Sequence, residues 1–172
     1  MKIFIFFFIF FFNTSIYAIN IATVDLDLIL NKSFSYQTFI NTINEFIDRE
    51  TLKFKSNETI LQKNKADIES KQNILNESEF NKLISNYNDQ LNVYQNNINN
   101  FNLLIDKNIE VNKKIIINKV IEILKEISIQ DNYDLILTSN NFLLAHNKFD
   151  ISNQVIIKLD EYKILLNTNN IK

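Results

Sequence analysis

The chain has 172 residues with no Gly, Pro, Cys or Trp, and its formal net charge is −2. Without Gly it cannot contain the phosphate-binding loops, dinucleotide fingerprints or nucleophile elbows that need Gly for close backbone approach or strained turns. The absence of Cys excludes disulfides and thiolate metal sites. The slightly acidic charge argues against nucleic-acid binding, which needs a concentrated basic surface. We therefore expect no enzyme and no cofactor.

The first 18 residues have the organisation of a secretory signal peptide. Lys2 precedes the apolar run Ile3–Phe12, and a polar segment then leads to the small residue Ala18. The run is too short to cross a bilayer, which takes about twenty apolar residues. A retained anchor is the alternative. We expect cleavage after Ala18 and export into the periplasm of a bacterial envelope, which would leave a chain with a net charge of about −3 because Lys2 is removed.

The segment after the leader alternates β-branched and aliphatic residues over Ile19–Leu26, which predicts a strand with both faces covered. Asp25 and Asp27 then start a short helical stretch, and Ser33 is placed to cap the helix that follows. Two nearby carboxylates can serve as acid and base or lie at a solvated strand end. We favour the second interpretation because no catalytic partner is nearby, and His146, the only His, has no second metal ligand.

An apolar residue returns about every seventh position over most of residues 34–129, which predicts an antiparallel helical hairpin, a coiled coil. In the first half the stripe consists of Ile40, Ile47, Phe54, Leu61, Ile68 and Leu75. In the second half two series run in parallel, Phe80, Tyr87, Tyr94, Phe101 and Ile84, Leu91, Ile98, Ile105. Twelve of these residues, all except Phe80 and Ile84, form the predicted seam between the two arms.

Three features interrupt the seven-residue apolar repeat of the predicted hairpin. The polar run Asn76–Glu79 is the expected reversal, with Ser78 as a candidate cap. The second stripe changes phase after Ile105, a stutter that unwinds a supercoil locally. Asn57 and Asn64 fall where apolar residues would pack best; they either fix register or leave the arms loose. General drift towards Asn and Ile, each about one residue in six, also accounts for them.

The C-terminal part, from residue 130 onwards, predicts a return to β structure. Asn132 stands where Gly usually ends a helix in the left-handed conformation. We expect strands at 133–139 and 142–145 joined by a two-residue turn at Asn140–Asn141. A short amphipathic helix capped by Ser152 follows, and residues 161–172 are a polar tail that continues this helix or frays.

The predicted fold class is α+β, mainly α. A β body (19–33 and 130–160) with a short C-terminal helix carries the inserted hairpin (34–129), behind the leader (1–18) and before the tail (161–172). Three short strands make a marginal sheet, so we expect several bodies to merge into an oligomer. The candidate body contacts are Ile21, Val24, Leu135, Leu137, Phe142 and Leu144.

The order of these elements resembles the Skp/OmpH family of periplasmic chaperones. Residues 21–30 (IATVDLDLIL) are similar to the opening strand motif of that family, and residues 132–138 (NYDLILT) to its closing motif. Phe142–Ala145 followed by 150–159 (DISNQVIIKL) is similar to its last strand and helix. The resemblance covers nearly all of the chain after the leader.

The resemblance implies a homotrimer with a nine-stranded body and three projecting arms. It also implies ATP-independent holding of unfolded outer-membrane β-barrel proteins. The tip around Lys71 and Lys82 mixes Lys with Glu, so its charge is near zero and argues against membrane or lipopolysaccharide contact. A structural coiled-coil adaptor of the envelope and a degenerate chaperone with residual activity are the alternatives.

Overall fold

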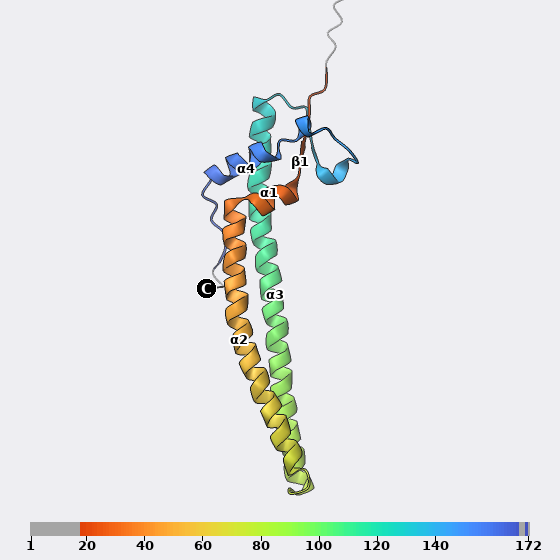
Figure 1. The fold of residues 1–172 in the computed structure, drawn as a ribbon, viewed down its shortest axis with the longest axis vertical. Coiled ribbons are helices and arrows are strands. Elements are labelled where there is room, and N and C mark those ends of the chain that lie inside the picture. The colour runs from red at the N-terminus through yellow and green to blue at the C-terminus, as the bar shows by residue number, and fades with distance from the viewer. Residues whose placement is uncertain (1–17, 169–170, 172) are drawn as a thin grey trace, which may run out of the picture.

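Two long helices dominate the computed structural model, which describes residues 18–168 and residue 171. Helix α2 (Phe34–Lys71) has 38 residues and α3 (Glu77–Gln130) has 54. They run antiparallel as a rod (Figure 1). At about 1.5 Å per residue, α2 is about 57 Å long and α3 about 80 Å. The predicted helical hairpin is thus confirmed, and the surplus length of α3 carries it past the start of α2 into the body.

The arms reverse between Gln72 and Asn76, slightly before the predicted place. Asn76 is the N-cap of α3, with extended backbone, and its Oδ1 accepts a hydrogen bond from the N–H of Glu79 at 3.0 Å. The prediction of Ser78 as the cap is wrong, since Ser78 lies within the first helical turn. Asn and Ser are both good caps, but capping by Asn76 also puts two Glu residues in the first turn, where the helix dipole favours negative charge.

The body joins the two ends of the described chain. Strand β1 (Ile21–Val24) pairs in parallel with β2 (Leu135–Thr138), and the register aligns Ile21 with Leu135. Helices α1 (Leu26–Lys32) and α4 (Ser152–Glu161) lie beside α3 at this end of the rod (Figure 1). Parallel strands need a long crossover connection, and here that connection is the whole hairpin.

The predicted third strand is wrong for the single chain. Ser139–Asn141 form a 3₁₀ turn, and Phe142–Ala145 pair with no strand among the described residues. A two-residue hairpin turn of type I′ needs positive φ at both central residues, and among the described residues only Asn132 has it. The free edge of β1 instead meets Asp150, through a bridge with Thr23 and a 2.9 Å hydrogen bond from Ile151 N–H to Thr23 O.

Besides Ser78, three boundary residues were predicted, and two of them are confirmed. Ser33 Oγ accepts from Tyr36 N–H at 3.2 Å and so caps α2. Asn132 has φ 54° and lies just beyond the end of α3. The prediction for Ser152 is wrong, because Asp150 Oδ1 accepts from the N–H of Ser152 while Ser152 Oγ accepts from Asp25 N–H at 2.8 Å. Ser152 therefore ties α4 to the end of β1.

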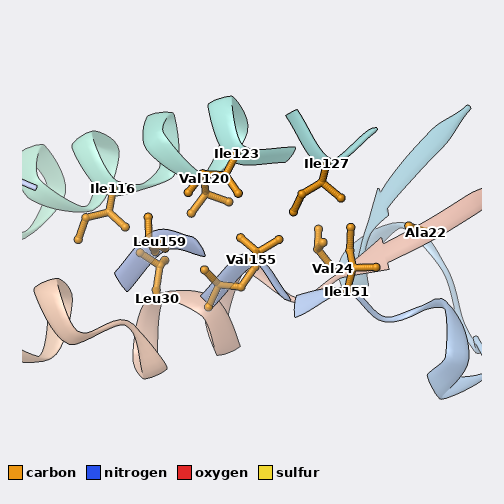
Figure 2. Packing of buried hydrophobic residues seen from close by; sticks show 11 residues of the cluster. Ala22, Val24, Leu30, Ile116, Val120, Ile123, Ile127, Ile151, Val155 and Leu159 are labelled. Atoms are coloured by element: carbon orange, nitrogen blue, oxygen red, sulfur yellow. The ribbon is translucent and has the colours of Figure 1, made fainter. Parts of the chain in front are cut away.

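The main core lies where α3 crosses the body. A row of four side chains from α3 faces residues of α1, α4 and β1 (Figure 2). The row consists of Ile116, Val120, Ile123 and Ile127, and the facing side chains include Val24, Leu30, Ile151, Val155 and Leu159. All nine are buried. Burying a branched aliphatic side chain contributes roughly 1.5–3 kcal/mol, so this cluster holds the body together.

The phase change predicted after Ile105 is present in α3, where Ile116 and Ile123 are fully buried and Ile109 is half-buried. The buried positions of α3 step by four three times in succession, from Asn108 through Asn112 and Ile116 to Val120. A heptad seam alternates steps of three and four, so this run contains two extra steps of four, which amount to two successive stutters. They turn the buried stripe of α3 away from α2 and towards the body core.

The C-terminal tail neither continues α4 nor projects into solvent. Helix α4 ends at Glu161, and the following residues run back along α2 (Figure 1). Ile164 packs against the body core, while Leu166 packs against both this core and a second cluster around Phe39 and Ile43. Ile171 is buried in that second cluster.

Candidate interaction site

The side chains that the sequence offered for acid–base or metal chemistry lie at the start of a helix or on the surface. Residues 18–168 and 171 contain no group of three or more His, Cys, Asp or Glu side chains placed to hold a metal. Asp25 caps α1 by accepting from Leu28 N–H at 2.9 Å, and Asp27 is exposed in the first turn of that helix. His146 is exposed, and its Nδ1 accepts from Lys148 N–H at 3.2 Å.

Membrane-spanning segments and charged side chains give no further candidate site within residues 18–168 and 171. No helix within the described part of the chain is both long and apolar enough to span a bilayer. A hydrogen bond from Lys53 lowers the pKa of the Glu50 carboxyl on α2, and both side chains are on the surface of the arm. Such exposed pairs contribute little to stability.

The proximal part of the seam is closed by aromatic side chains. Phe46 of α2 packs against Phe101 of α3 with ring centroids 5.7 Å apart. The ring of Phe54 meets Phe101 edge-on at 5.3 Å and Tyr94 at 6.4 Å. Such pairs contribute roughly 0.5–1.5 kcal/mol each beyond their buried area, so this region holds the arms together.

The structure places the twelve predicted seam residues on the facing sides of the arms, where each is buried or half-buried. The buried members are Leu61, Ile68 and Ile105, and the half-buried members are Ile40, Ile47, Phe54, Leu75, Tyr87, Leu91, Tyr94, Ile98 and Phe101. Sequence reasoning missed Phe39 and Ile43, which are more deeply buried than any of these on α2. Their spacing of four, continued by Phe46 three residues later, is the signal that could have found them.

The middle of the arms opens into a pocket of about 380 Å³. Its lining residues come from both helices and are Asn57, Ile60, Leu61, Asp89, Gln90, Val93, Tyr94 and Asn97. Ile60 is 54 % and Val93 59 % exposed, so apolar surface is presented here to solvent. Asn64, the second predicted irregularity, donates from Nδ2 to Gln90 Oε1 at 3.2 Å. The two Asn positions thus mark a polar, loosely closed stretch of the seam.

Further exposed apolar side chains are spread along both arms. They include Leu52, Ile60 and Ile74 on or just beyond α2, and Val93, Leu103, Ile121 and Ile129 on α3. Along each helix they are separated by many Asn, Lys and Glu residues. Dispersed apolar contacts of this kind suit many weak interactions better than one tight interface.

A second apolar surface lies on the body beside β2. Leu144 is 89 % exposed and Leu143 fully exposed, a few residues after the half-buried end of β2. Among the predicted body contacts, Leu135 and Leu144 are exposed, Ile21, Leu137 and Phe142 are half-buried, and Val24 is buried. Val24 belongs to this chain's own core, so the available contacts are those of the β2 edge and the segment after it.

The described chain thus combines a small body with a long helical hairpin that exposes apolar side chains. Residues 20–159 match the family described as outer membrane protein (OmpH-like), and the chain belongs to that family. Among curated proteins, none matches the chain.

The fold is also that of a solved structure. It resembles a candidate outer membrane chaperone (OmpH-like) from Caulobacter crescentus CB15 with a TM-score of 0.65. The sequences are 15% identical, and the match covers 87% of this chain and 89% of the other. The similarity extends over the arms and the body together, so the whole arrangement is that of the relative.

Proposed function

We propose that this protein is an ATP-independent holdase that binds unfolded outer-membrane β-barrel proteins in the periplasm. The observation that supports this most is the dispersed apolar surface of the arms around the open pocket at Ile60 and Val93. An unfolded client has no fixed shape, so it is best held by many weak contacts over a long surface. Membership of the OmpH-like family supports the same conclusion.

The active form in this proposal is a homotrimer assembled through the bodies. A two-stranded sheet is marginal by itself, and the exposed Leu135 and Leu144 border the β2 edge. Pairing with a neighbouring copy would convert Phe142–Ala145 into the third strand that the single chain does not form. Three hairpins would then surround a shared space for the client.

The proposed location follows from the leader, residues 1–18. Its apolar run lies outside the described residues, so the expected cleavage after Ala18 rests on sequence alone. The mixed charge at the tip argues against membrane or lipopolysaccharide as a principal partner, because Lys71 already pairs with Asp67 at 2.6 Å.

The test is aggregation of a urea-denatured outer-membrane β-barrel protein on dilution, followed by light scattering. We expect the chain without its leader to suppress scattering at about three protomers per client, without ATP. The double substitution Ile60→Asn and Val93→Asn should weaken suppression several-fold, and Asn96→Ser on the same arm serves as the control. A structural adaptor would leave scattering unchanged at every ratio.

A further inference from the structure

The C-terminal tail (residues 162–168 and 171) lies in a groove beside α2 and α3 and belongs to no helix or strand, and Ile171 N–H donates back to Thr168 O at 3.2 Å. We call this the tail groove and define it by Phe39 and Ile43 of α2 and Ile105 and Asn112 of α3. Along the tail, Ile164 and Leu166 are half-buried while Leu165 between them is 81 % exposed. This period of two is that of a β-strand lying on a surface.

One buried side chain binds the backbone of the tail. Asn112 is fully buried, and its Oδ1 accepts from the N–H of Asn167 at 2.6 Å. Its Nδ2 donates to Asn167 O at 2.9 Å and to Asn108 O at 2.9 Å. Asn112 therefore engages both backbone groups of one tail residue, as a neighbouring strand would do. Contacts to backbone groups are independent of the sequence that is bound.

Apolar side chains supply the remaining contacts. Leu166, one residue before the bonded backbone, packs against both the body core and the cluster around Phe39 and Ile43. Ile171 is buried in that same cluster. The groove thus accepts apolar side chains on one face of an extended backbone and leaves the other face in solvent.

We propose that the tail groove is a binding site for extended polypeptide segments with alternating apolar side chains, and that the tail is its intramolecular occupant. This rests on the proposed function, because strands of outer-membrane β-barrels alternate in this way. The tail then competes with clients. Only a segment that binds better than the tethered tail displaces it, so the tail sets a threshold for capture.

The direct test uses a chain that ends at Glu161 and a fluorescein-labelled peptide with the sequence of residues 162–172. We expect the peptide to bind the shortened chain at least tenfold more tightly than the full chain, by fluorescence anisotropy. A peptide N-methylated at the amide of Asn167 keeps every side chain but loses the donor to Asn112, and should bind at least tenfold more weakly. Equal binding of the two peptides to the shortened chain, or of the unmodified peptide to both chains, would overturn the proposal.

Two variants of the shortened chain locate the binding. Asn112→Leu should abolish peptide binding, whereas Asn118→Leu, at an exposed position of the same helix, should leave it unchanged. Circular dichroism must first show equal helix content. Loss of binding in both variants, or in neither, would contradict the assignment to the tail groove.

A second measurement keeps the full chain and does not depend on the shortened one folding. The chain has no Cys, so Leu165→Cys carries a single environment-sensitive dye, and Ile157→Cys on α4 is the control. Adding an unfolded β-barrel client should shift the fluorescence of the dye at position 165 to that of the same dye on an isolated tail peptide. The fluorescence of the dye at position 157 should stay unchanged. If the client binds and the fluorescence at position 165 stays fixed, displacement is refuted while the holdase function stands. If no client binds, the holdase function fails, and the peptide measurements alone decide the groove.

Discussion

The carboxylate of Asp160, near the end of α4, accepts a hydrogen bond at 2.9 Å from the backbone N–H of Phe34, the first residue of α2. This N–H is one of the unpaired donors that every helix has at its start. Ser33 satisfies a second one, that of Tyr36. The negative charge also lies at the positive end of the helix dipole. The arm is therefore attached to the body by a charged group on α4.

Removing this attachment should destabilise the protein modestly. We expect Asp160→Ala to lower the free energy of unfolding by about 0.5–1 kcal/mol, since an exposed capping bond and a dipole contact are lost. The measurement is urea denaturation followed by circular dichroism. Asp160→Asn keeps an acceptor and should lose less. The neighbouring Glu161→Ala is the control, and an equal loss there would show that Phe34 is not what Asp160 stabilises.

The left-handed residue at the end of α3 allows a matched pair of substitutions. Asn132 has φ 54°, and Tyr133 N–H donates back to Ser128 O at 3.0 Å, as in a Schellman motif. Asn132→Ala should cost about 1 kcal/mol, because a Cβ without a local polar partner disfavours this conformation. Asn132→Gly should be neutral or stabilising. Denaturant midpoints give the comparison, and a more stable Ala than Gly variant would contradict the assigned geometry.

Two isoleucines close together on α3 differ sharply in burial. Ile127 is fully buried in the body core, whereas Ile129 is largely exposed. Ile127→Ala should cost roughly 2–5 kcal/mol through lost burial and a cavity, and Ile129→Ala less than about 0.5 kcal/mol. Thermal unfolding checks this. Similar melting temperatures for both variants would show that the core does not lie where α3 crosses the body.

The proposed assembly predicts the effect of a charge on the body edge. Leu144→Asp should convert trimers to monomers at micromolar concentration, because a carboxylate would be buried in the new contact. Sedimentation equilibrium measures the mass. Ile157→Asp, at an exposed position on α4, is the control and should remain trimeric. A wild-type chain that sediments as a monomer would refute the assembly itself.

The predicted leader can be examined in isolation. Protein recovered from the periplasm of an expressing bacterium should begin at Ile19, because the signal peptide is removed after Ala18. N-terminal sequencing or intact mass determines this. Ala18→Leu should slow processing, since the cleavage site requires a small residue. Exported protein that still begins at Met1 would support the retained anchor instead.

The helical arms and most of their ends were predictable because the information is local. A seven-residue apolar period, a Ser before Phe34 and an Asn after the last turn each act over a few residues. The reversal was misplaced because Asn76 and Ser78 are both competent caps only two residues apart, and local chemistry does not distinguish them well.

The body and the tail groove were less predictable because they depend on distant contacts. Asn140–Asn141 is a good turn sequence, but whether a strand returns depends on a free edge and on what lies beside it. Asn112 could not be singled out among so many Asn residues, since its importance comes from burial beside Asn167. Ile164 and Leu166 form too short an alternation to indicate a strand without knowledge of the groove.

The parallel pairing of β1 with β2 constrains the order in which the molecule can be completed. The backbone N–H of Asn20, just before β1, donates a hydrogen bond to Asp134 Oδ2, 114 residues further along the chain. During synthesis β1 has no partner strand until both arms have been made. The two arms are close in sequence at their reversal, so they can pair before that. The sheet therefore closes only after the arms have formed, and a chain that ends before Leu135 has the helical hairpin but lacks β2 of the body.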